Sequence, residues 1–595
     1  MTQALPDRTV PDLLDERVAA SPEAAAFCCE QADGSWAPVS WHDFHAQAGR
    51  LAAGLLAQGL RKGDRLALIA PVSLEWELLH HAALRTGIVV VGLDAHDLPA
   101  RLALMCDTAD ITAVATTAPG LLAALRPDRL QRLRCVILLL PGSDGDAPAG
   151  VPALPLEQLA AAGAAAGGTA AGADAPRPAP GDTATIIFTS GTTGDPKGIA
   201  YTQAQLCLAI DAIADAFPFV GPGSRLLCWL PLSNLFQRMV NLAGMRRGAA
   251  SYLLGDPRRV MDVVAGVSPD VFIGVPRFYE KLYQGIQARI AALPPLQRRL
   301  ARLAWETGRR ATACRLEKKP TPPGLALAHR LLDRTVLSRI RRTMGTRLRC
   351  MVTGSAPTPE YLLRDFYALG WLLLESYGLS ENVLPMAMNR IDDFEFGTVG
   401  RPVPGNDIRV SDDGVIAVRG PGVFGGYLTG AAAPSPVAGD YFQTADIGSF
   451  DEQGCLRLLG RIDEVVKTST GKRIQLNAIE AVLRGVPGVV DAVVVAGGRR
   501  FPVAVCTTEL SPRPAAVAQA LEARLAAALT SLPADHRPPI VLISDKPFSV
   551  LDGELTSNLK VRRQAVEQRF EPRIAAALSR FGDPGEAGRN PVVVW

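Results

Sequence analysis

The first 140 residues alternate stretches of helical periodicity with short runs of apolar residues. Residues 43–60 repeat apolar side chains at helical spacing, and Arg65-Leu66-Ala67-Leu68-Ile69 follows as a short apolar run. Residues 89–91 and 136–139 are further short apolar runs, typical of strands buried on both faces. Helices that alternate with such strands predict α/β architecture with a mainly parallel sheet.

The character of the chain then changes several times. Residues 141–180 are rich in Ala, Gly and Pro, which predicts a mobile surface linker. Residues 285–345 are strongly basic and helix-patterned; they are either solvated amphipathic helices or a surface near a membrane or an acyl substrate. A Gly-rich meander at 400–460 precedes a compact segment with a helix at 478–483 and a strand at 489–495.

A boundary near residue 461 divides the chain into two expected domains. A chain of 595 residues is too long for one simple core. The predicted fold class is α/β, with a large N-terminal domain of layered sheets and helices over residues 1–461. A small, mobile α+β domain is predicted over residues 462–595.

Composition narrows the class of protein. Hydrophobic content of 48% and charged content of 20% suit a compact protein, and a net charge of +3 does not favour nucleic acid as a partner. The ten cysteines form no C-x-x-C pair, and no signal peptide or membrane-spanning run is visible, so we expect a reduced cytoplasm. None of the seven histidines falls in a candidate motif, and a G-x-S-x-G elbow is missing, so a serine hydrolase gains no support.

The run TSGTTGDPK, residues 189–197, follows the apolar residues 184–188 and concentrates hydroxyl groups, glycines and one lysine. Backbone N–H groups of such a turn can form an anion-binding nest, and lysine adds a point charge for phosphate. It is not a Walker loop, because Asp195 and Pro196 stand between the glycine and the lysine. An ordinary polar turn is the alternative. We predict an ATP phosphate site at Thr189, Ser190, Gly191, Thr192, Thr193, Gly194 and Lys197.

Lysine is scarce in this chain. Nine lysines stand against 53 arginines, and four of the nine lie in candidate motifs. A lysine is a compact charge that arginine cannot replace at a tight site, although coding bias would also leave few lysines. These four are Lys197, Lys467, Lys472 and Lys560.

Further motifs follow along the chain. In the segment 375–381, Tyr377 offers a ring for stacking on adenine, and Glu381 is an oxygen ligand suited to Mg²⁺. Asp446 can accept hydrogen bonds from both ribose hydroxyls, and Arg461 can donate to ribose or phosphate. Taken singly, each could be a plain loop.

Taken in order, these motifs resemble the adenylate-forming superfamily, and in particular its long-chain acyl-CoA synthetases. The resemblance rests on residues 189–198, 230–238, 352–357, 375–381, 441–464, 467–474 and 554–563. It implies that Lys560 neutralises charge during adenylation, that Asp463 is the hinge of a rotating C-terminal domain, and that the Lys467 loop faces the site during thioester formation. It also implies nucleotide contacts from Gly354, Ser355, Ala356, Ser376, Gly378 and Ser380.

Three positions depart from the family pattern. Asn234 stands where members commonly have a histidine associated with the carboxylate and phosphate end of the pocket. Asparagine can form hydrogen bonds but cannot carry charge. Gln237 often corresponds to glutamate, and Ala445 usually to glycine. The departure at Asn234 leaves the identity of the substrate open.

The resemblance implies a two-step reaction. A carboxylic acid, fatty or aryl, attacks the α-phosphate of MgATP, and coenzyme A then takes the acyl group. In an alternative, a specialised biosynthetic ligase, a carrier protein or an amine accepts the acyl group in place of coenzyme A. Asn234 motivates a further alternative, activation of nitrite for reaction with an aryl amine. A non-catalytic nucleotide-binding protein is disfavoured by the joint presence of Lys197, Glu381, Asp446, Arg461 and Lys560. We expect a small-molecule acid or oxyanion as partner, and peripheral membrane contact is compatible with the sequence.

Overall fold

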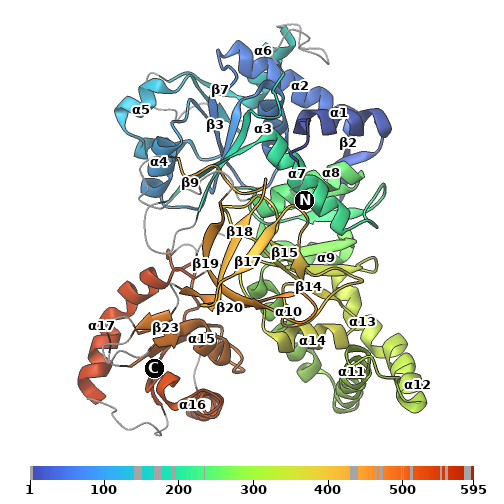
Figure 1. The fold of residues 1–595 in the computed structure, drawn as a ribbon, viewed down its shortest axis with the longest axis vertical. Coiled ribbons are helices and arrows are strands. Elements are labelled where there is room, and N and C mark those ends of the chain that lie inside the picture. The colour runs from blue at the N-terminus through green and yellow to red at the C-terminus, as the bar shows by residue number, and fades with distance from the viewer. Residues whose placement is uncertain are drawn as a thin grey trace.

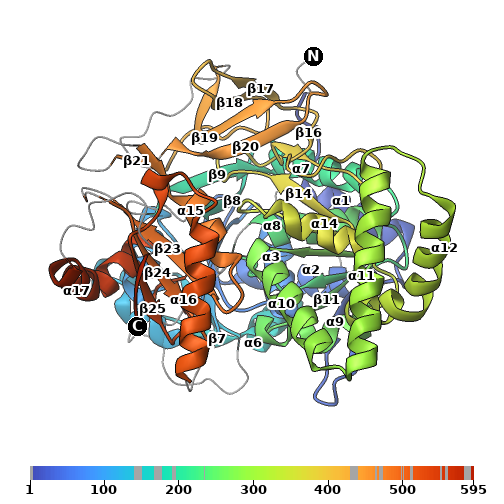
Figure 2. The same cartoon turned by 90° about the horizontal axis from the view of Figure 1, so that it is seen from below.

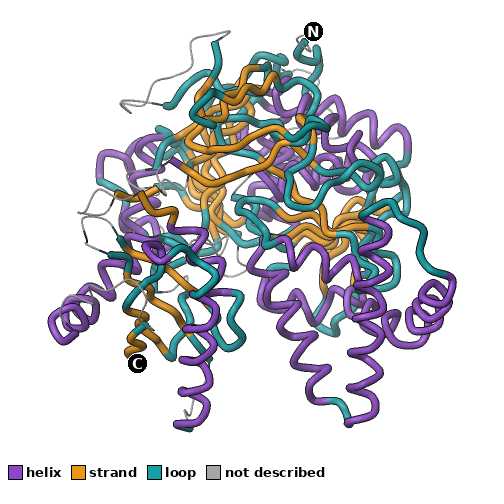
Figure 3. The backbone as a smooth tube through the Cα atoms, turned by 60° about the horizontal axis from the view of Figure 1, so that its bottom comes forward, coloured by secondary structure: helices purple, strands orange, loops and turns teal. Residues whose placement is uncertain are grey.

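A computed structural model gives the arrangement of the chain (Figure 1). It describes residues 4–139, 151–165, 177–189, 196–233, 235–428, 440–462, 465–467, 473–496, 499, 501–509, 514–549, 552–555, 561–581 and 591–595. Helices surround the strands of the large sheets, and the last part of the chain forms a separate group of strands and helices (Figures 1 and 3).

A seven-stranded sheet contains the apolar runs of the N-terminal part. Its strands run in the order β7-β6-β5-β3-β4-β8-β9, and every pair is parallel except β8 with β9. In β3, Leu66 and Leu68 face one core cluster while Ala67 and Ile69 face another, so this strand is buried on both sides. The strands are β3 (Arg65–Ile69), β4 (Val89–Leu93), β5 (Ala113–Thr116), β6 (Cys135–Leu138), β7 (Ala153–Pro155), β8 (Thr183–Phe188) and β9 (Gly198–Thr202).

A nine-stranded sheet follows the order β16-β15-β14-β13-β12-β10-β11-β1-β2. Its central strands β11, β10, β12, β13 and β14 are parallel, so their carboxyl ends meet at one edge. The strands are β1 (Ala25–Glu30), β2 (Trp36–Ser40), β10 (Arg225–Cys228), β11 (Ala250–Leu253), β12 (Val271–Gly274), β13 (Cys350–Thr353), β14 (Leu373–Tyr377), β15 (Ala387–Met388) and β16 (Arg401–Pro402).

Helices cover both large sheets, and many of them contribute to one main hydrophobic core. Within the described residues, no helix is both long enough and apolar enough to cross a bilayer. The helices up to residue 368 are α1 (Val10–Ala20), α2 (Trp41–Ala57), α3 (Leu74–Thr86), α4 (Pro99–Thr108), α5 (Pro127–Arg132), α6 (Leu156–Ala165), α7 (Gln203–Ala216), α8 (Leu235–Arg247), α9 (Val260–Val267), α10 (Pro276–Ala292), α11 (Pro295–Leu316), α12 (Pro323–Leu332), α13 (Ser338–Arg341) and α14 (Glu360–Ala368).

The Gly-rich meander forms a four-stranded antiparallel sheet, and a β-hairpin follows it. The chain then ends in a mixed four-stranded sheet with core clusters of its own. The α/β fold with a small C-terminal α+β part is therefore confirmed. These elements are β17 (Asp407–Val410), β18 (Val415–Arg419), β19 (Phe442–Phe450), β20 (Leu456–Arg461), β21 (Val465–Lys467), β22 (Arg473–Gln475), α15 (Leu476–Arg484), β23 (Asp491–Val495), β24 (Val503–Thr507), α16 (Ala515–Leu529), β25 (Ile540–Ser544), α17 (Arg563–Phe581) and β26 (Val592–Val594).

The expectation of a linker over the whole of residues 141–180 is wrong. Strand β7 and helix α6 lie inside this range, and α6 packs against α2. The helices meet at two glycines: a Cβ added to Gly54 would lie 2.2 Å from the carbonyl oxygen of Leu159. A composition rich in small residues indicated flexibility, but here it permits close helix packing.

Gly163 provides a test of this contact. A Cβ at residue 163 would lie 1.9 Å from the carbonyl oxygen of Arg50 and 2.6 Å from the backbone nitrogen of Gly54. Both atoms belong to the backbone, so Gly163→Ala should force the helices apart and destabilise the protein by about 1–3 kcal/mol. Thermal unfolding would measure the loss. The matched control is Gly49→Ala on α2, the opposite helix of this contact, where an added Cβ meets nothing within 4 Å. Equal melting temperatures for the two variants would contradict the argument.

Candidate active site

Several predicted site residues follow strands of the nine-stranded sheet at its carboxyl edge. The turn at 354–357 follows β13, and the turn at 378–381 follows β14. The carboxyl edge of a parallel sheet is where α/β proteins commonly bind ligands. The antiparallel strands β19 and β20 add Asp446 and Arg461, which are paired in register.

Asp446 lies at the centre of one cluster. Its Oδ2 accepts a hydrogen bond from the Tyr377 hydroxyl at 2.5 Å, and its Oδ1 accepts one from Arg461 Nη1 at 3.0 Å. The backbone N–H of Asp446 donates to Thr444 Oγ1 at 3.1 Å, which fixes the carboxylate relative to β18 and β19. Each carboxylate oxygen can accept two hydrogen bonds, so both can still receive hydroxyl donors from a ligand.

Tyr377 is more enclosed than an adenine-stacking ring would suggest. Only 7% of its surface is exposed, and it belongs to a small apolar cluster with Val399 and Ile416. Burial, followed by the charge of Asp446, raises the pKa of the Tyr377 hydroxyl far above its usual value. The hydroxyl therefore stays protonated and serves as a fixed donor to Asp446. Stacking of Tyr377 on adenine stays a prediction.

Glu381 and Lys197 are joined through a residue that we did not predict. The Tyr427 hydroxyl donates to Glu381 Oε1 at 2.7 Å, and Lys197 Nζ lies 5.0 Å from the centre of the Tyr427 ring. Burial and the neighbouring Glu381 raise the pKa of Tyr427 above its usual range, so this hydroxyl remains a donor. One aromatic ring thus orients the predicted metal ligand and holds the predicted phosphate-binding lysine by a cation–π contact.

The hairpin of β8 and β9 is fixed to the same turn. The buried Tyr201 hydroxyl donates to the carbonyl oxygen of Ser380 at 2.5 Å, and Leu428 N–H donates to the carbonyl oxygen of Gly198 at 2.8 Å. The backbone N–H of Thr189 donates to the carbonyl oxygen of Lys197 at 3.0 Å and closes the base of the predicted phosphate loop. Both ends of this loop are therefore held beside the turn that carries Glu381.

The turn after β13 contains small residues for a geometric reason. A Cβ on Gly354 would lie 3.2 Å from the carbonyl oxygen of Ser376, so the two neighbouring strand ends approach closely. Ser355 has a φ of +70°, a left-handed conformation that costs energy for residues other than glycine. Such outliers are common at ligand sites. Ala356 follows Ser355 directly, and Gly378 follows the end of β14.

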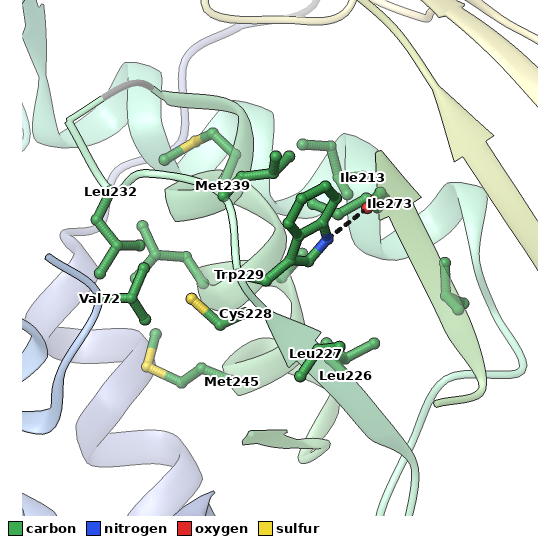
Figure 4. Close-up of a cluster of buried hydrophobic side chains, with 14 of the residues drawn as sticks. Val72, Ile213, Leu226, Leu227, Cys228, Trp229, Leu232, Met239, Met245 and Ile273 are labelled. Carbon is green, nitrogen blue, oxygen red and sulfur yellow. Dashed lines mark hydrogen bonds between the residues drawn. The ribbon is translucent and has the colours of Figure 1, made fainter. Parts of the chain in front are cut away.

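Gln237 holds the backbone that precedes Asn234. Its fully buried Oε1 accepts from the backbone N–H groups of Trp229 at 3.4 Å and Leu230 at 3.3 Å. Its Nε2 donates to Asn241 Oδ1 at 3.0 Å, a bond that a carboxylate could not make. Trp229 is fixed further by its indole N–H, which donates to the carbonyl oxygen of Ile273 within an apolar cluster (Figure 4).

A buried polar network extends from Asn241 to α3. Asn241 Nδ2 donates to Glu77 Oε1 at 2.6 Å, and Glu77 Oε2 lies 3.5 Å from His80 Nδ1. Arg238 is 1% exposed, donates to Thr185 Oγ1 at 2.9 Å, and lies over the Trp76 ring. Burial lowers the pKa of Arg238 to about 10. Glu77, His80 and His81 could also hold a metal ion by spacing, but the neighbouring guanidinium opposes a second cation there.

This network predicts a pH-dependent stability. Burial lowers the pKa of His81 to about 3, whereas an unfolded histidine titrates near 6.5. Stabilisation is complete above pH 6.5 and is lost as the pH falls towards 3, because only the unfolded chain binds the proton in that interval. His81→Gln should therefore reduce the loss of stability between pH 8 and pH 5 by about 2 kcal/mol.

Melting temperatures at the two pH values would measure this effect. Burial raises the pKa of Glu77 and acts in the opposite direction, so the informative quantity is the difference between variant and wild type. His42→Gln, at an exposed site, is the control. An unchanged pH profile for His81→Gln would show that His81 does not carry the linkage.

Among the described residues, two ion pairs join the C-terminal part of the chain to the N-terminal part. Arg277 on α10 binds Asp491 on β23 at 2.9 Å, with both side chains largely buried. Arg562 binds Asp97 at 3.1 Å, at a small cleft lined by His96 and Leu555 among others. Asp97 follows β4, and β4 is parallel to β8, so Arg562 lies at the sheet edge from which the predicted phosphate loop begins.

Several predicted residues lie outside the described part of the chain, and the structure places only the backbone of Lys467, in β21. Those outside are Ser190, Gly191, Thr192, Thr193, Gly194, Asn234, Asp463, Lys472 and Lys560.

Comparisons with known proteins agree with this arrangement. The family described as "AMP-binding enzyme" matches residues 14–428. The long-chain-fatty-acid–CoA ligase FadD15 of Mycobacterium bovis is 30% identical over 575 residues, covering 92% of this chain and 93% of the relative. Long chain acyl-CoA synthetase 7 of Arabidopsis thaliana is 28% identical over 483 residues, and the alignment covers 76% of this chain and 66% of the relative.

Solved structures give the same fold. The anthranilate CoA ligase AuaEII with bound anthranoyl-AMP superposes with a TM-score of 0.72 at 18% identity, covering 96% of this chain and 98% of that chain. The A domain of a carboxylic acid reductase from Segniliparus rugosus gives a TM-score of 0.75 at 17% identity, and the superposition covers 96% of this chain and 94% of that chain. By the match over residues 14–428 and the similarity to FadD15 over nearly the whole chain, this chain belongs to the family of AMP-binding, adenylate-forming enzymes.

Proposed function

We propose that the protein is an ATP-dependent acyl-CoA synthetase that adenylates a carboxylic acid and then forms a thioester with coenzyme A. The observation that carries the proposal is the link from Lys197 through Tyr427 to Glu381, beside the Asp446–Arg461 pair. The link joins a cation to a carboxylate, and Asp446 adds an acceptor suited to ribose hydroxyls. The named activity of the relative FadD15, similar over nearly the whole chain, favours a fatty acid as substrate.

In the adenylation step, the acid's oxygen attacks the α-phosphate of ATP, and the bond to pyrophosphate breaks. The loop from Thr189 to Lys197 would hold the β- and γ-phosphates, and Asp446 would accept the ribose hydroxyls. This reaction needs positioning and neutralisation of charge more than an acid–base pair. The described residues at the site are hydroxyls, cations and carboxylates, in keeping with that requirement.

The residues at Glu381 fit a magnesium ion delivered with the nucleotide. The Tyr427 hydroxyl donates a hydrogen bond to Glu381 Oε1, so Glu381 Oε2 would coordinate the ion. Mg²⁺ typically takes one or two protein carboxylates plus phosphate oxygens. Bound there, Mg²⁺ would neutralise phosphate charge. Glu381 would orient the ion, and Tyr427 would orient Glu381.

We propose that residues 462–595 rotate about Asp463 between the two half-reactions. In the adenylating arrangement Lys560 would face the nucleotide, and in the thioester-forming arrangement the Lys467 loop would replace it. The contact of Arg562 with Asp97 supports the first arrangement, since Arg562 is two residues from Lys560 in the sequence. Rotation would have to break this ion pair and the buried pair of Arg277 with Asp491.

Substrate-dependent release of pyrophosphate from ATP tests the proposal. Fatty acids of several lengths, aryl acids, and nitrite with an aryl amine would each be assayed with and without coenzyme A. Release with a fatty or aryl acid, and thioester formation when coenzyme A is present, is the expected result. Release with no candidate would contradict the enzyme assignment. Adenylation of an acid without use of coenzyme A would favour a carrier protein or an amine as acceptor. Pyrophosphate release with nitrite and the aryl amine, but with none of the acids, would support the alternative suggested by Asn234.

A further inference from the structure

The most exposed apolar side chains of the described chain lie on two neighbouring helices. Helices α11 and α12 carry Leu296 (80% exposed), Leu303 (57%), Leu327 (71%) and Leu331 (63%). These are the four most exposed large hydrophobic side chains among the described residues. Single exposed leucines need no explanation, but such a concentration marks a surface for interaction.

The first half of α11 is divided into distinct faces. Leu296, Leu300 and Leu303 are spaced by four and three residues and therefore line one exposed stripe of the helix. The buried face contains Ala304 and Trp305, which pack into the main core. The leucine stripe is thus additional to the apolar face that the fold requires. It begins near the start of α11, the helix that follows α10 (Figure 2).

Arginines flank this stripe. Arg299 and Arg302 are exposed and, within the described part of the chain, form no ion pair. Arg298 donates to the carbonyl oxygen of Leu293, at the turn before α11. Long cationic side chains beside exposed leucines are typical of a helix that lies in a lipid headgroup region.

The charge of this region is opposite to that of the remaining chain. Residues 285–345 contain fourteen Lys and Arg against three Asp and Glu, a net charge of +11. The other residues contain 48 Lys and Arg against 56 Asp and Glu, a net charge of −8. The overall value of +3 conceals this segregation. An anionic surface would attract one region of the protein and repel the rest, which fixes its orientation.

We propose that the leading half of α11, residues 295–303, docks the protein on an anionic phospholipid surface. The leucines would enter the boundary between headgroups and acyl chains, and Arg299 and Arg302 would contact phosphates. A bilayer is favoured over a protein partner because the exposed leucines alternate with exposed arginines along one helix, and the surrounding region carries a large net positive charge. No described helix can span a membrane, so the contact is peripheral.

Vesicle co-sedimentation of the whole protein tests the proposal without ATP or any acid, so it is independent of the proposed enzymatic activity. Wild type should bind vesicles of equal parts phosphatidylcholine and phosphatidylglycerol, should bind phosphatidylcholine alone much more weakly, and should be released by salt. Arg299→Gln with Arg302→Gln should weaken binding roughly 10-fold or more. Leu296→Ser with Leu303→Ser should also weaken it.

The matched control is Leu5→Ser with Leu104→Ser, two exposed leucines on other parts of the surface; it should bind as wild type does. All variants alter exposed side chains, and melting temperatures would verify their folding. Lack of binding by wild type, or equal binding by all variants, would overturn the proposal. Loss of self-association by the α11 variants, measured by sedimentation velocity without lipid and not accompanied by vesicle binding, would assign this surface to a second copy and would equally overturn it.

Discussion

Replacement of Lys560 by alanine is expected to slow adenylate formation by about 10²–10³-fold, the usual cost of removing one group that stabilises developing charge. The physical reason is local: as the acid attacks, negative charge increases around the α-phosphate, and a lysine ammonium is a compact charge that can approach it. The ion pair of Arg562 with Asp97 holds Arg562, which is two residues from Lys560 in the sequence, at the edge where β4 and β8 end.

The measurement separates the half-reactions. Adenylation is followed by pyrophosphate release, and thioester formation is followed from a chemically prepared acyl-adenylate and coenzyme A. Lys560→Ala should impair only the first. Lys546→Ala is the control, because Lys546 lies in the same C-terminal part and forms an exposed ion pair with Asp552. Equal losses in both half-reactions, or normal adenylation, would remove Lys560 from the proposed role.

The broad organisation of the fold could be predicted because it depends on local pattern. Apolar runs such as residues 65–69 become strands buried on both faces, and the helix expected at 478–483 forms as α15 (Leu476–Arg484). Helix α6 could not be predicted in the same way. Its glycine and alanines are uninformative until α2 is placed against it, since Gly54 and Gly163 matter only through backbone atoms of the opposite helix.

In the candidate site, too, residues in local motifs could be predicted, whereas residues that act through distant partners could not. Asp446 and Arg461 were named from their motifs, and the register of β19 with β20 brings them together. Tyr427 was missed because its partners Lys197 and Glu381 lie far from it in sequence, and a tyrosine after two glycines has no specific signal. Gln237 was noticed only as a departure from a pattern; its bonds to Trp229 and Asn241 explain why an amide works there.

The substitution Glu381→Gln is expected to lower the rate of adenylation by about 10²-fold and to raise the magnesium concentration needed for half-maximal rate, because an amide oxygen is a weaker ligand for a hard cation. Tyr427→Phe should have a smaller effect, about 5-fold, since it removes one hydrogen bond to Glu381 but keeps the ring beneath Lys197.

A magnesium titration of pyrophosphate release distinguishes the roles of these two residues. Glu381→Gln should remain impaired at saturating ATP and recover in part with excess magnesium, whereas the exposed control Glu452→Gln should match wild type. If Tyr427 acts by orienting Glu381, adding Tyr427→Phe to Glu381→Gln should cost much less than Tyr427→Phe alone, because the bond it removes no longer orients a metal ligand. Additive losses would place Tyr427 in an independent role, and an unchanged magnesium requirement for Glu381→Gln would exclude Glu381 as the metal ligand.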